Sequence, residues 1–486
     1  MTETGSLSRT YRYSKHLGFV PLIAISGAAY GGLLLTHLRS GTLTHEIVPI
    51  SITLYLIAFV AYLGALIWTE YRRGIPAAYL WGGAVGFRLL LILTDPTLST
   101  DVYRYLWDGF VANNGISPYA FPIESSQLDH LDLPIRALAN HTWMASPYLP
   151  AAQALFRSVT ALTPLQPIYM QMIMATLDLM NGLLIIALLG IAGLPGYRAL
   201  IYLWSPLAIV ETAHGAHVDA WMIFLSLAAL YLVLRQPRTR FDPVAATWLA
   251  PTLLALATLT KLLPALLLPV LFWRWRWRSL LAYGALLVLL LAPAGIEAGW
   301  GLSGPLDGHG LFGALRIYGD RWNFNSGIFY WLEGALADPA ATDHSLEIAN
   351  RYAKQIVGSG LLLVLLGVWW LARSRTTACS QLRLMAASII GYALLTTTLH
   401  PWYLLMLLAL LPFLTPARDE SKTLWLLVAP WIYLSGAIFT SYYTYVNPLD
   451  LREYPWVRQV EWLPTLALLL FAAGFIFVRK RSTQSR

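Results

Sequence analysis

The stretch LSTDVYRYLWDGFVANNGISPY, residues 98–119, begins just after a long apolar run ends near residue 94. It carries three charged residues, Asp101, Arg104 and Asp108, among three tyrosines and a tryptophan. Asp95-Pro96 separates it from the apolar run, because proline disfavours helix at the residue before it. The chain therefore leaves an apolar run here and begins a polar segment with a structure of its own.

Residues 101–114 have the spacing of an amphipathic helix. Ser99 or Thr100 can cap its start, and Gly115 can end it. Its apolar and charged residues fall on different faces, so we expect a helix on the membrane surface with its charges directed away from lipid. The charged stripe has two explanations at this point, a wetted face or part of a functional site.

The composition is that of a membrane protein. Of the 486 residues, 57% are hydrophobic and 12% are charged, whereas a soluble domain has about 25% charged residues. The single cysteine, Cys379, excludes an internal disulfide framework and a cysteine-rich metal site. The N-terminus is polar up to about Lys15 and a long apolar run follows, which indicates an uncleaved first span and not a signal peptide.

The apolar runs predict an all-α polytopic membrane protein with about fourteen transmembrane helices. A helix needs about 20 apolar residues to cross the hydrocarbon core. Runs near that length, and shorter ones split by polar breaks, are residues 17–38, 47–69, 76–94, 168–193, 198–213, 218–235, 244–260, 262–273, 279–296, 356–372, 382–399, 401–415, 423–440 and 462–478.

The basic residues predict the orientation of these spans. With a cytoplasmic N-terminus, 21 of the 33 Lys and Arg residues fall on inner segments and 11 on outer ones, as the positive-inside rule requires. Topology thus explains the net charge of +8, and we expect no nucleic-acid partner. Both termini are then cytoplasmic, and the two long loops, 95–167 and 297–355, lie on the outer side. A catalytic site, if the protein has one, is expected on that side.

One polar break, ETAHGAHVDAW, gathers Glu211, His214, His217 and Asp219. Ionisable groups at membrane depth cost about 2.5–3.5 kcal/mol each on insertion scales and are functional candidates. Two histidines and a carboxylate can bind zinc, but a glycine-containing turn at the interface also tolerates polar residues. We favour the explanation that these residues form a polar turn over a zinc site. We therefore expect no cofactor, although a divalent metal is compatible with these side chains.

Three further places carry polar residues at outer positions. Lys261, in LATLTKLLPALLLP, either extends to the membrane surface or holds an anion such as the phosphate of a lipid carrier. His400, in TTLHPWYLLML, is either structural or an orienting group. The segment GDRWNFNSG supplies an aromatic ring and amides that suit a sugar, and its candidates are Arg321, Trp322, Asn323 and Asn325.

Several motifs, taken in order, resemble polytopic GT-C glycosyltransferases, and the bacterial polyprenyl-phosphate-mannose-dependent mannosyltransferases match best. The motifs cover about residues 75–415 and are DVYRYLWDGFVANNGISPYAF, SPYLPAAQALF, Asp178 within a span, WSPLAIVETAHGAHVDAW, TKLLPALLLP and HPWYLLMLL. HPWY is also similar to an element of the first GPI mannosyltransferase. The resemblance implies transfer of mannose or another hexose from a polyprenyl-phosphate carrier to a lipid-linked or glycan hydroxyl acceptor. The reaction would take place outside a bacterial or archaeal cytoplasmic membrane.

The resemblance also implies an acidic catalytic base in the first large outer loop, which by matching is Asp101. Many of these enzymes place this acid after their first span, whereas here it follows the third. We therefore divide the chain into two extra N-terminal spans (1–75), a catalytic membrane module (76–300) and a C-terminal part (301–486). The acidic pair frequent in the family is Asp101-Val102 here, which argues against a required metal.

The expected mechanism needs one base and one cation. A carboxylate can take the proton of an acceptor hydroxyl as the oxygen attacks C1, and a single displacement inverts the sugar. The leaving lipid phosphate needs a positive group, for which Lys261 is the first choice and Arg104 or Arg321 the second. The residues expected to contact sugar or acceptor are Tyr103, Trp107, Asp108, Tyr119, His214, His217, Asp219, Trp322, Asn323, Asn325 and His400.

Two other functions stay open on the sequence. A polymerase or ligase of lipid-linked glycans also works on the outer side, but it uses a pyrophosphate carrier. A secondary transporter has charges near the membrane midplane, where only Arg88, Asp178 and Glu211 qualify.

Overall fold

The computed structural model describes residues 18–38, 46–236, 239, 241–304, 306–337, 343–417, 420–447 and 451–484. Within these ranges the secondary structure is helical, apart from one isolated β-bridge between Phe324 and Thr398. The prediction of an all-α protein is therefore confirmed. The polar segment up to Lys15 lies outside the described residues.

Eight helices in the described ranges are long and apolar enough to cross a membrane, or nine if a bent pair counts as one span. The pair is Pro206–His214 (α10 and η3) with Asp219–Leu234 (α11), bent by 117° at the predicted break. The chain is thus a multi-pass membrane protein. The eight are Phe19–Leu38 (α2), Ile47–Arg72 (α3), Pro167–Ile191 (α8), Trp277–Ala298 (α15), Ser345–Ala372 in α18 (Asp343–Ala372), Ala378–Leu395 (α19), Lys422–Val446 (η7, α21 and η8) and Pro455–Ile476 in α22 (Pro455–Gln484).

The other predicted spans are shorter or interrupted helices, so fourteen crossings are not shown. Pro264 and Pro269 interrupt the run after Lys261, as proline does inside a helix. These segments are Ala77–Ile92 (α4), Leu200–Leu203 (α9), Asp242–Val244, Ala245–Leu249 and Ala250–Thr258 (α12, η4 and α13), Leu263–Leu267 and Leu268–Leu271 (η5 and α14), and Pro401–Leu404 and Leu405–Leu414 (η6 and α20).

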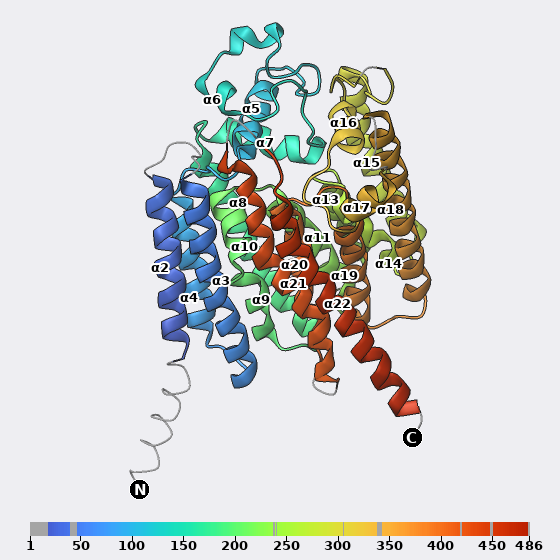
Figure 1. The fold of residues 1–486 in the computed structure, drawn as a ribbon. Coiled ribbons are helices and arrows are strands. Elements are labelled where there is room, and N and C mark those ends of the chain that lie inside the picture. The colour runs from blue at the N-terminus through green and yellow to red at the C-terminus, as the bar shows by residue number, and fades with distance from the viewer. Residues whose placement is uncertain are drawn as a thin grey trace.

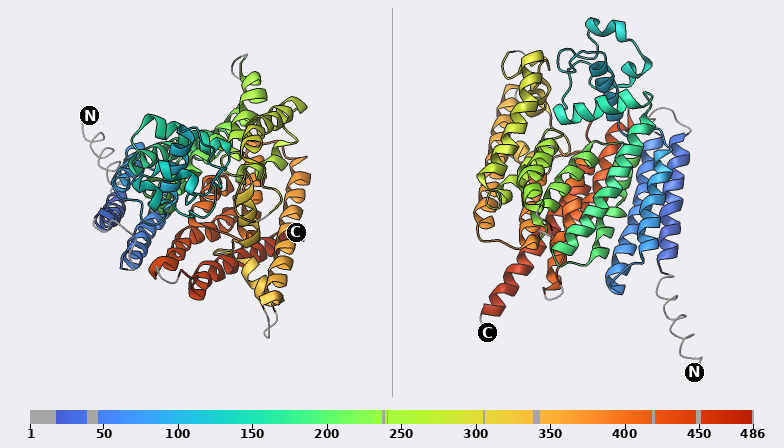
Figure 2. Two further views of the ribbon diagram at one scale, coloured as in Figure 1. Left: turned by 90° about the horizontal axis from the view of Figure 1, so that it is seen from above. Right: turned by 180° about the vertical axis from the view of Figure 1, so that it is seen from behind.

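The long helices run side by side and carry a cap at one end (Figure 1). The cap contains α5 (Asp101–Asn113), α6 (Pro134–Leu138), α7 (Pro150–Leu162) and α16 (Gly313–Arg321). Figure 2 shows α7 lying across the end of the bundle. The start of α2 and the end of α22 both lie at the end of the bundle opposite the cap (Figure 1).

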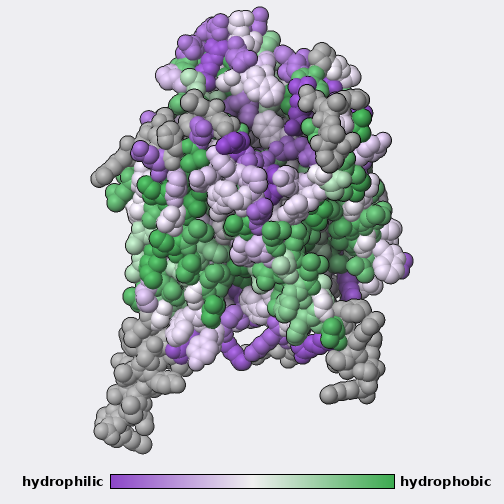
Figure 3. Space-filling view, viewed as in Figure 1, coloured by the Kyte–Doolittle hydropathy of each residue, from purple (hydrophilic) through white to green (hydrophobic). Residues whose placement is uncertain are grey.

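Apolar residues form a belt around the middle of the bundle on the face drawn in Figure 3, and hydrophilic residues gather over the cap. A belt of this kind is what a protein surrounded by lipid exposes, because unpaired polar groups are costly in hydrocarbon. The cap therefore lies at the end of the bundle where polar chemistry is possible.

The helix α5 is the one predicted over residues 101–114, and it packs into the cap. Ser99 Oγ accepts a hydrogen bond from the backbone N–H of Asp101 at 3.3 Å. Gly109 allows α7 to approach closely, since a Cβ there would lie 2.4 Å from the carbonyl oxygen of Phe156. The charged stripe is not wetted: Arg104 and Asp108 are 1% and 2% exposed and form an ion pair at 2.9 Å. The wetted-face explanation is therefore wrong.

Two charges inside the bundle neutralise each other. Arg88 in α4 and Asp178 in α8 are buried and lie 2.5 Å apart. Arg88 also donates to the carbonyl of Leu203 at 2.9 Å, and the Tyr202 hydroxyl donates to Asp178. Because buried charges are tolerated when they are paired and hydrogen-bonded, this pair joins α4, α8 and α9 as a structural feature.

Candidate active site

A cavity of about 820 Å³ lies where the cap meets the bundle. Its lining comes from stretches distant in sequence, within 97–101, 140–149, 260–266, 315–324, 392–403 and 444–445, together with residue 451 and one residue each of α11 and α18. The predicted site residues that line it are Asp101, Asp219, Lys261, Trp322 and His400. The fold thus brings the first choices for base and cation to one cavity.

Asp101 is the first residue of α5, and its side chain is 16% exposed. Asn140 Nδ2 donates to Asp101 Oδ1 at 2.6 Å, and the Tyr105 hydroxyl lies 3.5 Å from Oδ2. Asn140 therefore fixes Oδ1, whereas Oδ2 has only long contacts and can still accept a hydrogen bond from a ligand.

Lys261 lies between α13 and η5 and is held by a buried carboxylate. Its Nζ is 2.5 Å from Asp219 Oδ2 and 5.0 Å from the centroid of the Tyr403 ring. The lysine side chain is 19% exposed, whereas that of Asp219 is 2% exposed. An ammonium group has three donors, so it can keep Asp219 and bind an oxygen of an anionic ligand at the same time.

Four flat rings form a stack along one wall of the cavity. Phe324 stacks on His400 with centroids 4.6 Å apart, and His400 stacks on Trp402 at 4.6 Å. Trp402 stacks in turn on His217 at 3.9 Å. Burial, with a smaller effect of Lys261, lowers the pKa of His400 to about 3, so its ring is neutral near pH 7. The β-bridge to Thr398 holds Phe324 in this stack.

Trp322 belongs to a second aromatic group at the cavity. It stacks on Tyr318 with centroids 4.5 Å apart and meets the ring of His141 edge-on at 4.7 Å. Burial lowers the pKa of His141, against the opposing effect of Asp101. Arg321, which directly precedes Trp322, has a side chain that is 66% exposed and does not line the cavity.

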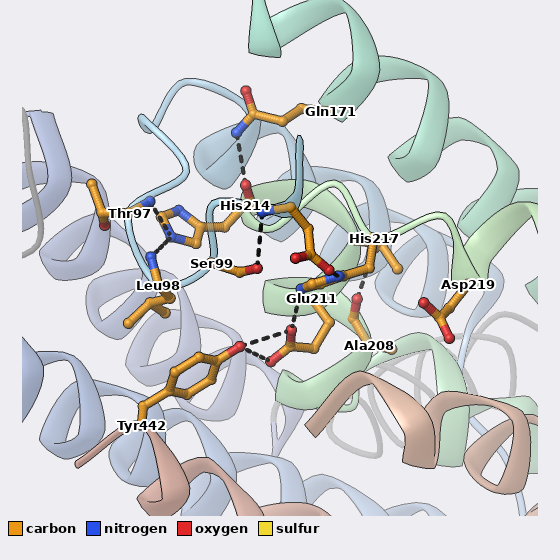
Figure 4. Close-up of polar contacts among 12 residues, drawn as sticks. Thr97, Leu98, Ser99, Gln171, Ala208, Glu211, His214, His217, Asp219 and Tyr442 are labelled. Atoms are coloured by element: carbon orange, nitrogen blue, oxygen red, sulfur yellow. Dashed lines mark hydrogen bonds and ion pairs between the residues drawn. The ribbon is translucent and has the colours of Figure 1, made fainter. Parts of the chain in front are cut away.

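His214 fixes the segment that leads into α5 (Figure 4). Its Nε2 accepts from the backbone N–H groups of Thr97 and Leu98 at 3.3 and 3.4 Å, and its Nδ1 lies 2.6 Å from Thr94 Oγ1. This buried histidine therefore positions the backbone before Asp101 and does not face the cavity. No group of three or more His, Cys, Asp or Glu in the described ranges is arranged to hold a metal ion.

Arg104 and Asp108 hold the loop that carries Asn140. Arg104 donates to the carbonyls of Asn140, His141 and Met144 at 3.4, 3.2 and 3.2 Å. Asp108 accepts from Arg104, from Gln153 at 3.0 Å and from the hydroxyl of Ser146. Both side chains are thus used within the cap, away from the cavity lining.

The remaining predicted contacts also lie outside the lining. The hydroxyl of Tyr119 donates to the carbonyl of Tyr148 at 2.8 Å, and Asn325 Nδ2 donates to Glu461 at 2.6 Å. His217 is fully buried behind Trp402. Of the rest, Trp107 is buried in an apolar cluster and Tyr103 packs against it, while Asn323 is half-buried.

Sequence reasoning missed several residues at the cavity. Trp402 and Tyr403 stand in the quoted HPWY motif, where only the histidine was selected. Asn140 and His141 carry no signal in the sequence, because their place at the cavity depends on how the loop 114–149 returns to α5. The left-handed φ of 50° at His141 shows how sharply that loop turns.

Residues 18–277, more than half of the chain, match a family model described as alpha-(1→6)-mannopyranosyltransferase, N-terminal domain. The chain belongs to this mannosyltransferase family. The resemblance to polyprenyl-phosphate-mannose-dependent GT-C mannosyltransferases is thereby confirmed. No curated protein and no solved structure matches the chain.

The matched part of the mannosyltransferase contains Asp101, Asp219 and Lys261, whereas Trp322 and His400 lie beyond it. It also includes both helices before α4. The division into 1–75, 76–300 and 301–486 stays a prediction.

Proposed function

We propose that the protein transfers mannose from polyprenyl-phosphate mannose to a hydroxyl of a lipid-linked or glycan acceptor, with inversion at C1. The observation that carries the proposal is that Asp101 and Lys261 line the same cavity from different elements. The family description points to an α-(1→6) product, so the acceptor hydroxyl would be the 6-OH of a mannosyl unit.

In this mechanism Asp101 is the base. The acceptor hydroxyl donates its proton to the carboxylate while its oxygen bonds to C1, and the C1–O electron pair stays on the lipid phosphate. A β-linked donor then gives an α-linked product through an oxocarbenium-like transition state. Asn140 holds the other oxygen of Asp101 and so orients the base.

Lys261 offsets the charge of the leaving group. The lipid phosphate gains negative charge as the C1–O bond breaks, and a fixed cation beside it lowers the barrier. Asp219 keeps the ammonium group at the cavity wall before the donor binds. Trp322 and Tyr318 supply aromatic surfaces for the apolar C–H faces of the sugar.

The cavity wall near Lys261 suits a lipid carrier. Leu262, Leu263 and Leu266 follow the lysine and line the cavity, and Leu262 is 57% exposed. An isoprenoid chain can therefore approach from the side of the bundle while its phosphate reaches Lys261. The partners of the protein are then the membrane lipid, the donor and the acceptor.

Donor specificity tests this function. The purified protein in detergent should transfer labelled mannose from polyprenyl-phosphate mannose to an α-mannoside acceptor. It should not transfer sugar from a polyprenyl-pyrophosphate glycan. Polyprenyl phosphate should compete with the donor. Transfer from the pyrophosphate carrier alone would instead indicate a polymerase or ligase and would contradict the proposal.

We also propose fourteen crossings, with both termini cytoplasmic and the cap outside a bacterial or archaeal cytoplasmic membrane. The basic residues and the position of the helix ends support this orientation. In a Cys379→Ala background, the exposed positions Gln127 in the cap and Ser374 between α18 and α19 are suitable for single cysteines. A membrane-impermeant maleimide should label Gln127→Cys in whole cells (spheroplasts if an outer layer blocks it) and Ser374→Cys only after lysis. The reverse pattern would overturn the orientation.

A further inference from the structure

His217 lies between two carboxylates, that of Asp101 at the cavity and that of Glu211 in the core of the bundle. Figure 4 shows His217 beside Glu211. Its Nδ1 is 3.7 Å from Asp101 Oδ2, and its Nε2 is 3.2 Å from Glu211 Oε2. The side chains of His217 and Glu211 are 0% and 1% exposed. The three groups form a line from the cavity into the protein interior.

Within the described residues, neither ring nitrogen of His217 makes a well-formed hydrogen bond. A buried polar group left without a partner costs about 1–3 kcal/mol, so this arrangement needs an explanation beyond packing. Catalytic hydrogen bonds are often long in the unliganded enzyme and tighten when substrate binds. The 3.7 Å contact between Nδ1 and Asp101 Oδ2 can become a hydrogen bond when Asp101 has taken up a proton.

The turn that carries His217 is built to hold the ring in place. A Cβ at Gly215 would lie 2.8 Å from His217 Cδ2 and 3.1 Å from the carbonyl oxygen of Glu211. Ala216 has a φ of 54°, a left-handed conformation that is unfavourable for a residue with a side chain. Strained backbone of this kind persists where the surrounding structure enforces it, and functional sites are common among such places. Trp402 covers the ring from the other side.

Glu211 is held as a hydrogen-bond acceptor. The hydroxyl of Tyr442 donates to its two carboxylate oxygens at 3.0 and 3.1 Å (Figure 4). The ionised form of Glu211 requires Nε2 of His217 to be the donor toward Oε2. The remaining ring nitrogen, Nδ1, then directs a lone pair toward Asp101.

We propose that Asp101, His217 and Glu211 form a proton relay, in which His217 takes up the proton that Asp101 removes from the acceptor hydroxyl. The inference rests on the proposed role of Asp101 as the base. Neither His217 nor Glu211 touches the substrate, so both are positioning residues that act through Asp101.

The relay moves a single proton. The acceptor oxygen bonds to C1, its proton moves to Asp101 and on to His217 Nδ1, and the C1–O electron pair stays with the lipid phosphate. The resulting imidazolium lies between two carboxylates, and Asp101 is again negative beside the positively charged sugar of the transition state. The proton returns through Asp101 to the departing lipid phosphate, whose second pKa is about 6.

Several other titratable or charged groups surround the relay and contribute to its pH response. They are Tyr442 in η8, Tyr55 in α3, Asp219 in α11, Lys261 after α13, His214 in η3 and His400 before η6. The test must therefore compare variants with one another and not rely on a single pH profile.

Glu211→Gln removes the carboxylate and keeps its shape. We expect kcat to fall about a hundredfold, at the lower end of general acid–base effects, with the donor Kd unchanged within twofold. Glu461→Gln is the matched control, because Glu461 is also fully buried and accepts from Asn325 and Thr440, away from the cavity lining. A Glu211→Gln variant with the kcat of the control would overturn the relay.

His217→Ala opens a space beside the cavity for a small base. Added imidazole should restore at least a tenth of the wild-type kcat, whereas thiazole, a ring of similar size and much weaker basicity, should not. Equal rescue by both rings would show that His217 only fills space, which contradicts the proposal. If His217→Ala does not fold, Glu211→Gln decides the question alone.

Asp101→Asn, measured in the same assay, separates this inference from the proposed function. An inactive Asp101→Asn beside a fully active Glu211→Gln would remove the relay and leave Asp101 as the base. An active Asp101→Asn would remove both.

Discussion

Asp101→Asn should lower kcat by about 10²- to 10⁴-fold, the range typical of losing a general base. The amide keeps the size of the carboxylate and can still contact Asn140 and Tyr105, so the cap should fold and the cavity should keep its shape. An amide cannot accept the acceptor proton, however, and transfer should stop at that step. Turnover with labelled polyprenyl-phosphate mannose, together with donor binding by the same purified variant, measures the effect.

The matched control is Asp132→Asn, which removes an exposed carboxylate from the same outer loop. It should leave both kcat and donor binding unchanged. A Asp101→Asn variant that binds donor and turns over like Asp132→Asn would show that the base is another residue.

Lys261→Met should weaken donor binding by about tenfold to a hundredfold, since a hydrogen bond to a charged group contributes about 1.5–3 kcal/mol. It should also destabilise the protein, because it leaves Asp219 buried without its cation, and breaking a buried pair costs about 3–5 kcal/mol. The donor dissociation constant and the thermal unfolding temperature in detergent report the two effects separately.

The double variant Asp219→Asn/Lys261→Met separates the phosphate role from the structural role. Removing the carboxylate as well should recover most of the lost unfolding temperature, because no unpaired charge is left in the bundle. Donor binding should stay weak, because the cation for the phosphate is still absent. If the double variant recovers both stability and donor affinity, Lys261 serves only to neutralise Asp219.

Much of the membrane architecture could be predicted from local patterns. The apolar runs, the proline-broken segment after Lys261 and the sharp turn at residues 214–217 all fall where the sequence placed them. The count of crossings could not be fixed in this way, because hydropathy does not distinguish a continuous helix from one that is broken into short pieces. The eight or nine helices of sufficient length leave that count open.

The candidate site also contains residues that the sequence predicts and residues that only the fold brings together. Lys261 and His400 are predictable because each is a polar residue between two apolar runs, whereas the role of Asp101 follows from the family resemblance. The charge of Arg104 makes it a second choice for the donor phosphate, but it pairs with Asp108, and local sequence does not predict the loop that buries both. The ring stack could not be predicted, because Phe324 reaches His400 through a bridge to Thr398, more than 70 residues further along the chain.

The position of the donor in the cavity is the most direct test of the account. The measurement is a density map of the inactive Asp101→Asn variant with polyprenyl-phosphate mannose bound. We expect a phosphate oxygen within hydrogen-bonding distance of Lys261 Nζ, about 3 Å, and the C1 face opposite the phosphate turned toward residue 101. A phosphate bound at Arg321, or a C1 whose open face is turned away from residue 101, would contradict the account.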